Sequence, residues 1–393
     1  MIYNINILIN KILEVNVMGR FAMTGKLTIA GDRPNKPAFS DKLLDNGCVI
    51  RDLNLQIKCD KDTFNLQIKS FMNNTKKNSD GSINVNDSTI YSLIKDEEGK
   101  YSSIQFKYKD KDKYMNDLAE FKKFKFKNDN EKFEFCNGFD FAEFVHSELT
   151  SGKFDNAKFR VDGEIEYSSY KNPKTGMENI YTNYNIEKIY VMSDDAEEKA
   201  TCTLDMYITN ECIDDSELDE NASFKIMGYI PQYLSKKKGD IGYYQTLIYP
   251  LNIEKDKQEK KFNVLKNLLM DNFEDNELCK IGFKCILKNR IKEVDFDVDT
   301  MISDEERELL EFGIITKSEL EVKYGKGQGG RETSIEIESI TRTYTGGAIP
   351  VELTIEQLLS KPETDVKKEI NVDLNENSDD DLDIFADDDL LPF

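Results

Sequence analysis

Segments of alternating apolar and polar residues dominate this 393-residue chain, and their order constrains its fold more than any other feature. Alternation with a period of two predicts half-buried β-strands, whereas apolar residues at every third or fourth position predict an amphipathic helix. In the first half of the chain, strand patterns come first, one helix pattern follows, and two more strand patterns close the set. The strands are residues 21–29, 48–58, 63–71, 103–109, 159–167 and 181–192, and the helix is residues 139–149.

The same order of strands and helix recurs in the second half without obvious repetition of the residues. The strands there are residues 200–209, 223–229, 243–253, 279–287 and 333–344, and the helix is residues 262–273. Several strands, one helix and two further strands is the order of an OB-fold barrel. The sequence therefore predicts a mainly β protein with two consecutive OB-like β-barrels and short helices, followed by a disordered acidic tail. A large β-sandwich is the alternative, and the early strands admit more than one register.

Shifts in composition divide the chain into five predicted segments. They are an N-terminal extension (1–17), OB-like domain 1 (18–195), OB-like domain 2 (196–350) with an insertion at about 288–331, a helix and linker (351–378), and an acidic terminal segment (379–393). Short helices are expected at residues 304–312 and 354–360. Met18 begins a stretch typical of a domain start, so residues 1–17 are either an added short helix or the product of an upstream start.

Few residues in the chain are suited to catalysis or to metal binding. The seven cysteines are scattered without a CxxC pair, and His146 is the single histidine, which argues against a zinc site and against a disulfide framework. Nucleophile-elbow, zinc-protease and phosphate-loop motifs are all absent, so we expect no enzyme activity and no cofactor. Asp295, Asp297 and Asp299 alternate and could hold Mg²⁺ on one face of a strand, although a solvated acidic face is the simpler interpretation. No stretch of the sequence is long and apolar enough to span a membrane, and we expect a cytoplasmic location.

The charge of the chain restricts how it could bind nucleic acid. The formal net charge is −22, and residues 365–393, with eleven acidic residues and two lysines, supply −9 of it. The rest of the chain is therefore acidic too, which argues against diffuse attraction to phosphates. Any contact with DNA must come from grooves that are locally basic and rich in aromatic rings.

Three groups of residues combine the cations and aromatic rings that bind single strands. The chain has no Trp, so Phe and Tyr must supply the stacking surfaces. In the first barrel the candidates are Phe106, Lys107, Tyr108, Lys109, Lys122, Lys123, Phe124, Lys125, Phe126 and Lys127. A hairpin loop adds Tyr167, Tyr170, Lys171, Lys174 and Tyr181, and the second barrel adds Tyr233, Lys236, Lys237, Lys238 and Tyr243.

Two of these groups also have a purely structural interpretation. Residues 122–127 alternate basic and aromatic residues, so a strand would place the rings and the ammonium groups on opposite faces. This stretch could be an edge strand with a buried aromatic face and a solvated lysine face. The lysines at 236–238 could simply protect the tip of a hairpin from aggregation.

The last fifteen residues read DDDLDIFADDDLLPF and hold seven aspartates with no basic residue. Such a run cannot fold alone, because its charges repel one another and its few apolar groups bury too little surface to offset chain entropy. A C-terminal aromatic residue with a free carboxylate, preceded by acids, suits an apolar pocket with a basic rim on another protein. A solubilising acidic tail is the alternative.

The final seven residues, 387–393, here named the tip, resemble the acidic tip of bacterial and bacteriophage single-stranded DNA-binding proteins. The residues that carry this resemblance, and the expected partner-binding residues, are Asp387, Asp388, Asp389, Leu390, Leu391, Pro392 and Phe393. The resemblance implies an OB-fold protein that coats single-stranded DNA in replication, recombination or repair and recruits partner enzymes through its tip. A metal-dependent DNA-processing enzyme and an acidic scaffold or DNA mimic are the alternatives.

The resemblance also bears on origin and assembly. The Lys-, Asn- and Ile-rich composition indicates an AT-rich genome, and the two-barrel length indicates a bacteriophage protein in the cytoplasm of a bacterial host. Two barrels per chain would let a dimer supply the four barrels that bacterial relatives assemble, so a homo-oligomer is a further expectation.

Overall fold

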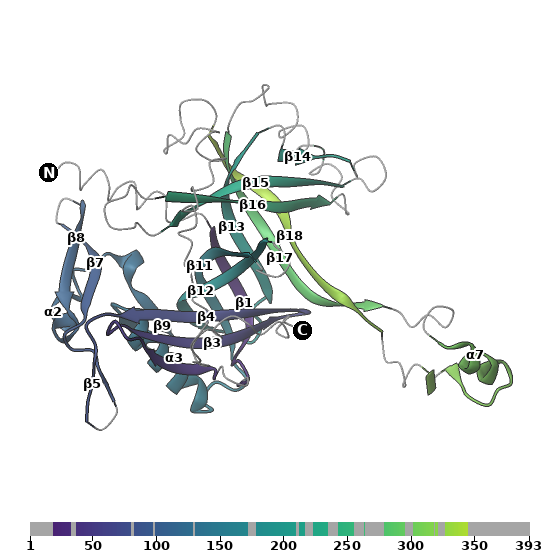
Figure 1. Cartoon of the computed structure of the whole chain (residues 1–393), viewed down its shortest axis with the longest axis horizontal. Coiled ribbons are helices and arrows are strands. Elements are labelled where there is room, and N and C mark those ends of the chain that lie inside the picture. Colours follow the sequence, from purple (N-terminus) through teal and green to yellow (C-terminus); the bar gives the residue numbers. More distant parts are fainter. Residues whose placement is uncertain are drawn as a thin grey trace, which may run out of the picture. The chain divides into compact units, whose positions relative to one another are not determined.

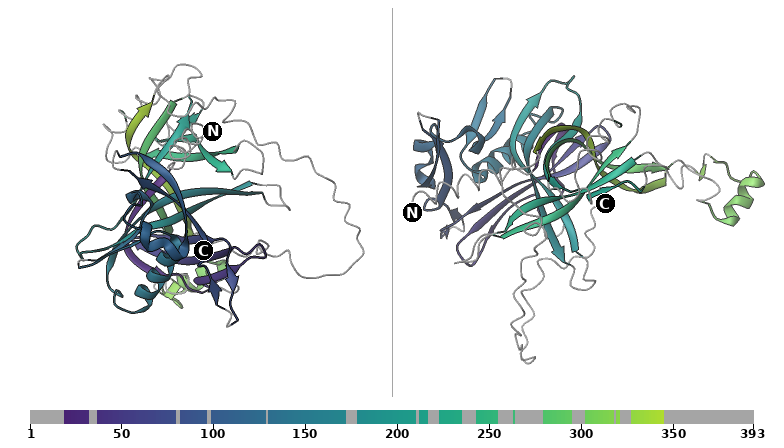
Figure 2. Two further views of the ribbon diagram at one scale, coloured as in Figure 1. Left: turned by 90° about the vertical axis from the view of Figure 1, so that its left-hand side faces the viewer. Right: turned by 90° about the horizontal axis from the view of Figure 1, so that it is seen from above.

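The structure is a computed structural model that describes most of residues 19–344. The described residues are 19–32, 37–79, 82–96, 99–128, 130–171, 178–209, 212–216, 223–234, 243–254, 263, 279–294, 302–317, 319–320 and 327–344. Strands account for most of them, and Figures 1 and 2 show the ribbon from three directions.

The elements of the first half are mainly long strands with short helices between them. The strands are β1 (Gly19–Ile29), β2 (Phe39–Leu43), β3 (Val49–Cys59), β4 (Asp62–Met72), β5 (Lys76–Lys77), β6 (Ile83–Asn84), β7 (Thr89–Lys95), β8 (Tyr101–Lys107), β9 (Phe124–Lys127), β10 (Lys132–Phe135), β11 (Lys158–Lys171) and β12 (Glu178–Met192). The helices are η1 (Tyr108–Asp110), α2 (Lys111–Tyr114), η2 (Glu120–Lys122) and α3 (Gly138–Thr150).

The second half also consists mainly of long strands. Its strands are β13 (Lys199–Ile208), β14 (Ile213–Asp214), β15 (Ser223–Leu234), β16 (Tyr243–Glu254), β17 (Cys279–Val294) and β18 (Gly327–Tyr344), and its described helix is α7 (Asp304–Glu311). The long strands β17 and β18 run side by side in Figure 1 and in Figure 2.

Five strands of the first half close into a ring. Strand β1 pairs with β3 and β11, β3 with β4, and β11 with β12, all antiparallel. The ring closes where β4 and β12 meet in parallel at Gln67 and Asn185. If β1, β3, β4, β11 and β12 are numbered 1 to 5 in chain order, the order around the ring is 1-2-3-5-4-1, and the parallel contact joins the third strand (β4) to the fifth (β12). That is the connectivity of an OB barrel, and α3 lies in the expected place between the third and fourth strands of the ring, β4 and β11.

The second half closes in the same order. Strands β13, β15, β16, β18 and β17 form the ring, and β16 meets β18 in parallel at Asn252 and Glu336. The ring is completed where Tyr207 of β13 pairs with Tyr229 of β15. The prediction of a mainly β chain with two OB-like barrels is therefore confirmed, and the closed rings exclude the β-sandwich alternative. The two barrels are joined through their first strands, because β1 pairs antiparallel with β13.

The barrel interior follows directly from the alternating pattern. In β3, Leu53, Leu55 and Ile57 are fully buried, whereas the intervening Asn54 and Gln56 lie on the outer surface. Successive side chains of a strand point to opposite faces, so a period of two sends every apolar residue inward. The core extends through both barrels as one cluster of aliphatic and aromatic side chains.

Helix α3 packs on β3, β4 and β9 of the first barrel. It begins after Asn137, whose side chain accepts a hydrogen bond from the Asp140 amide at 2.9 Å. Its buried face carries Phe141, whose ring lies 5.4 Å from that of Phe124. The contact explains why the rings of β9 turn inward, toward α3.

The strand β11 has a β-bulge between Asp162 and Gly163 in its pairing with β12. A side chain at Gly163 would bring its Cβ to 2.0 Å from the Asn185 carbonyl oxygen, so only glycine allows this approach of the two strands. The bulge reorients the outer face of β11 and β12 on either side of it.

By contacts the chain divides into two units, residues 1–290 with 333–358, and residues 291–332 with 359–393. In the second unit α7 begins with a capping box between Ser303 and Glu306, in agreement with the helix predicted at 304–312. The predicted helices at 262–273 and 354–360 and the acidic tail lie outside the described residues, apart from position 263. The predicted segment boundaries, at residues 17, 195, 350 and 378, stay predictions.

Candidate nucleic-acid interface

One row of side chains crosses four neighbouring strands on the outer surface of the first barrel. Lys132 of β10 pairs with Lys127 of β9, Lys127 with Tyr190 of β12, and Tyr190 with Arg160 of β11. Since neighbouring strands lie about 4.8 Å apart, the row spans roughly 15 Å. We call these four residues the Tyr190 row. It places one aromatic ring between cations on both sides.

The residues next to this row in sequence explain why it faces outward. Phe126, Ile189, Phe159 and Val161 precede or follow members of the row, and all four are fully buried in the core. The pleat of each strand therefore turns the row toward solvent.

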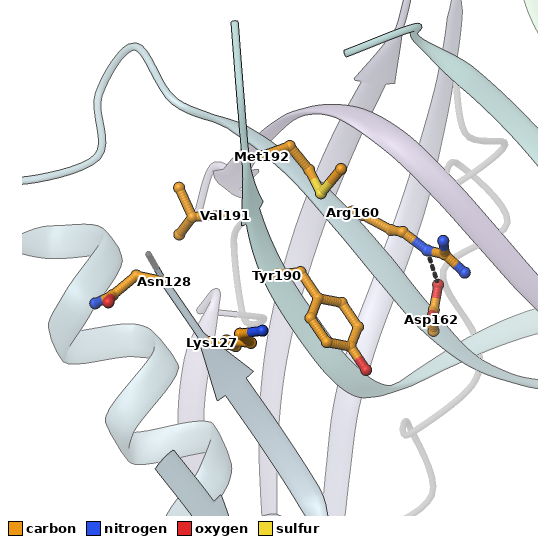
Figure 3. A pocket seen from close by; sticks show the side chains of 7 residues that line it. All are labelled: Lys127, Asn128, Arg160, Asp162, Tyr190, Val191 and Met192. Carbon is orange, nitrogen blue, oxygen red and sulfur yellow. Dashed lines mark hydrogen bonds and ion pairs between the residues drawn. The ribbon is translucent and has the colours of Figure 1, made fainter. Parts of the chain in front are cut away.

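A cavity of about 450 Å³ lies beside the row. Its lining residues are Lys127, Asn128, Arg160, Asp162, Tyr190, Val191 and Met192. Figure 3 shows Tyr190 between Lys127 on one side and the Arg160–Asp162 ion pair on the other. Aromatic, aliphatic and amide groups thus share the cavity with two cationic side chains.

The charges around Tyr190 are held in fixed places. Nε of Arg160 lies 2.8 Å from Oδ1 of Asp162, which orients the guanidinium, and this hydrogen bond raises the pKa of Arg160. Burial and then the negative charge of Asp162 raise the pKa of the Tyr190 hydroxyl. Lys127 is exposed and forms no ion pair with the described residues. The phenol ring therefore stays neutral at physiological pH, with the exposed Lys127 on one side and the Arg160–Asp162 ion pair on the other.

The next row along the same strands contains two acidic and two basic side chains. It runs Glu134, Lys125, Lys188 and Asp162 across β10, β9, β12 and β11. Lys125 is buried and forms ion pairs with Glu120 and Glu134. The hydrogen bond from Lys125 lowers the pKa of Glu120 to about 2. The acids of this row also form ion pairs with two cations of the Tyr190 row, Lys132 with Glu134 and Arg160 with Asp162. Lys127 is therefore the cation of the Tyr190 row that is most available to a phosphate.

A third part of the surface lies on β3, β4 and β12. Asn54, Gln67 and Asn185 lie in register across these strands, and Nε2 of Gln67 donates to Oδ1 of Asn185 at 2.8 Å. On β4 the Phe71 ring is 58% exposed, and the Lys69 ammonium lies 5.5 Å from its centroid. The outer faces of OB strands 2 and 3, here β3 and β4, are a common place for oligonucleotides to bind. Strands β4 and β9 both pair in parallel with β12, β4 at Asn185 and β9 at residues 188–190, so this surface lies next to the Tyr190 row.

Several of the residues predicted from the sequence are part of the core. Phe106, Phe126 and Tyr167 are 6%, 0% and 4% exposed, so none offers a ring face to a base. Phe124 is half-buried against Phe141. We leave these four out of the interface.

The predicted lysines of residues 122–127 divide into two kinds. Lys123 is 8% exposed and lies 3.4 Å from both Glu120 and Glu134, and Lys125 is held by the same two acids. Lys122 and Lys127 are exposed. The strand β9 lies between β10 and β12 and not at an edge, so its rings face inward as expected while its central lysine is ion-paired and not solvated.

The remaining predicted residues lie apart from the Tyr190 row or outside the described part. Lys107 is exposed, with Nζ 2.9 Å from the Asp87 carbonyl oxygen, and Lys109 is exposed near Asp87. Tyr108 donates a hydrogen bond to Asp140. Tyr181 is half-exposed on β12. Four predicted residues lie in strands β11, β15 and β16 at positions where side chains are not described: Tyr170, Lys171, Tyr233 and Tyr243. The rest lie outside the described residues: Lys174, Lys236, Lys237, Lys238 and the tip (Asp387, Asp388, Asp389, Leu390, Leu391, Pro392, Phe393).

Sequence reasoning missed Tyr190, Arg160, Lys132, Phe71 and Lys69. Tyr190, Arg160, Lys69 and Phe71 lie within predicted alternating strands, and Lys132 lies in a stretch where no strand was predicted. A cluster along the sequence could be recognised, but a row across four strands becomes visible only when their register is known.

The chain was compared with protein families, with curated proteins and with solved structures. No family model matches the chain, and no curated protein matches it. Among solved structures, a deletion mutant of the single-stranded DNA binding protein from Thermus aquaticus is similar over 82% of this chain and 93% of its own, with 10% identity and a TM-score of 0.28. A TM-score this low does not establish a shared fold, so the fold assignment rests on the strand order of the two rings.

Among the described residues, no group of three or more His, Cys, Asp or Glu side chains could hold a metal ion. The alternating Asp295, Asp297 and Asp299 lie outside those residues. Within the same part of the chain, no helix has the length and apolar character needed to cross a membrane.

Proposed function

We propose that this protein binds single-stranded DNA, without strong sequence preference, over the outer surface of its first barrel. The observation that carries the proposal is the Tyr190 row, which presents a neutral aromatic ring between cationic side chains beside a cavity of about 450 Å³. Base stacking accepts any base, and cations track the phosphates that every strand carries.

In this proposal a base stacks on Tyr190, and the flanking phosphates lie against Lys127 and Arg160. Stacking of one base on a ring contributes roughly 1–3 kcal/mol, and each phosphate neutralised in a single strand adds about −0.7 to the salt slope. The amide groups of Asn54, Gln67 and Asn185 offer donors and acceptors to base edges farther along the same surface.

Selectivity for single strands is expected because stacking on Tyr190 requires an unpaired base. Tyr190 is half-buried in its cavity, so a base must leave its stack to reach the ring. A base paired in a duplex would first have to unpair and unstack, which costs a few kcal/mol. The acidic remainder of the chain also repels duplex that is not held by this local basic row.

The wider role in this proposal combines the barrel surface with the tip. The protein would coat single-stranded DNA during replication, recombination or repair, as a phage-encoded protein in the bacterial cytoplasm. The tip (387–393) would recruit replication and repair enzymes, and a homo-oligomer would multiply the number of barrels on one strand. No catalytic step and no cofactor is part of the proposal.

Because the chain has no Trp, a single substitution creates a local fluorescent probe of this site. We expect the fluorescence of a Tyr190→Trp variant to be quenched by oligo-dT, with the same midpoint as binding measured by anisotropy. The matched control is Met227→Trp, at an exposed position on β15, the second strand of the other barrel. Quenching of the control alone would place the DNA on the second barrel and contradict the proposal.

A further inference from the structure

The β7–β8 hairpin exposes aromatic rings that the proposed interface on the barrel does not use. Tyr91 is 72% exposed, Tyr101 42% and Phe121 of the neighbouring η2 40%. The rings of Tyr101 and Phe121 meet edge to face, with centroids 5.2 Å apart. Clusters of exposed rings on a soluble protein mark surfaces that bind something.

Cations lie among these rings. Lys95 pairs directly with Tyr101 across the hairpin, and the ammonium of Lys122 lies 5.8 Å from the centroid of Phe121. Neither lysine forms an ion pair with the described residues. We call Tyr91, Lys95, Tyr101, Phe121 and Lys122 the hairpin patch.

The hairpin patch is supported from below by a small core of its own. Ile90 and Phe106 of the hairpin are buried against Leu118 and Cys136. The Ala119 amide donates to the Leu93 carbonyl oxygen at 2.8 Å, which fastens the segment before Phe121 to β7. Figure 1 shows β7 and β8 beside α2. The exposed rings therefore belong to a packed element, which reduces the entropy lost when a ligand stacks on them.

The hairpin patch and the Tyr190 row are connected through η2. Glu120 forms ion pairs with Lys125 and, at 3.7 Å, with Lys132 of the barrel surface. The next residue, Phe121, contacts Tyr101 of the hairpin. Two consecutive residues thus contact the two surfaces, and a strand leaving the row has a second set of rings within reach.

We propose that the hairpin patch is a second contact for the same single strand, stacking bases that lie beyond those held on the barrel. Rings with neighbouring lysines that form no ion pair with the described residues match the combination that binds single-stranded nucleic acid. This inference rests on the proposed function and adds to it a role for Tyr91, Lys95, Tyr101 and Phe121, which extend the binding site beyond one barrel.

The test compares two lengths of oligo-dT, because one OB fold covers roughly 4–16 nucleotides. We expect a Tyr91→Ala, Phe121→Ala variant to bind an oligomer of about 30 nucleotides tenfold or more weakly than the unaltered protein, since at least one stacked base is lost. Its affinity for an oligomer of about 8 nucleotides should be unchanged. Tyr91→Phe keeps the ring and should bind both lengths normally.

Phe312→Ala provides the control, because this ring is 77% exposed but belongs to the other unit. Circular dichroism of each variant checks that the fold is retained. Full affinity of the double variant for both lengths would overturn the hairpin contact and leave the barrel interface standing. An equal loss at both lengths would also overturn it, because the hairpin patch would then not be a separate contact. Absence of binding by the unaltered protein at either length would instead contradict the proposed function itself.

Discussion

Replacing Tyr190 and Arg160 together by Ala should weaken binding of oligo-dT by roughly tenfold to a hundredfold. The lost stacking surface is worth about 1–3 kcal/mol, and the lost guanidinium removes a phosphate contact. The slope of affinity against salt should become shallower by about 0.7 for that contact. Fluorescence anisotropy at several salt concentrations measures both effects.

Two matched variants make this result specific. Tyr190→Phe keeps the ring and should retain most of the affinity. Replacing Lys236, Lys237 and Lys238 by Ala removes three charges of the second barrel and should have the smaller effect. If the triple variant alone weakened binding, the second barrel would be the DNA-binding domain and the interface on the first would be refuted.

Of the lysines at 122–127, the structure favours Lys127 as the residue to change. Lys123 and Lys125 are buried beside Glu120 and Glu134, so their removal leaves carboxylates without their partners and acts on stability as well as on binding. Lys127→Ala removes an exposed cation of the Tyr190 row without that complication.

Deleting residues 387–393 should abolish capture of replication enzymes from a host lysate while leaving the fold intact. Oligo-dT binding should be unchanged, or slightly tighter at low salt, because the acidic tip no longer competes for basic side chains. The physical reason is that Phe393 would supply apolar burial of roughly 1.5–3 kcal/mol in a partner pocket. Its terminal carboxylate would pair with a basic residue there.

Two substitutions separate the parts of the tip. Phe393→Ala should reduce capture nearly as much as the deletion, because charge alone cannot fill a pocket. Changing Asp387, Asp388 and Asp389 to Asn should mainly slow association, since long-range charge affects the on-rate more than the affinity. Capture of the same partners by the truncated protein would mean that the tail only keeps the protein soluble.

The two barrels could be predicted from the sequence because their signal is local. Strands such as β3 and β4 carry clean alternation over eleven residues each, and the amphipathic helix α3 between β4 and β11 marks the order of the elements. No strand was predicted at β7 or β10, whereas the alternation that forms β9 was recognised as a possible strand. Strand β7 is held by its pairing with β8 and by a small core that includes Ile90, whereas Lys132 and Glu134 of β10 form an ion pair and β10 contacts α3.

The interface could be predicted only in part, because binding surfaces of a sheet run across strands. Lys127 was found as a member of a basic run, but Tyr190 and Arg160 join it only through the register of β9, β12 and β11. A residue was also wrongly assigned to the interface, again because the sequence does not show which elements cover a strand. Phe126 was proposed as a stacking ring, and it is instead buried under α3, with its ring 5.4 Å from that of Phe144.

Titration of the full chain with fluorescent oligo-dT and with a duplex of equal length, with and without Mg²⁺, tests most directly whether this protein binds single strands. We expect tight, salt-sensitive binding of the single strand, much weaker binding of the duplex, and no cleavage of either when Mg²⁺ is present. Equal affinity for the two forms would contradict the single-strand interface. Cleavage that depends on Mg²⁺ would favour a metal-dependent enzyme, and no binding of either form would leave an acidic scaffold or DNA mimic as the function.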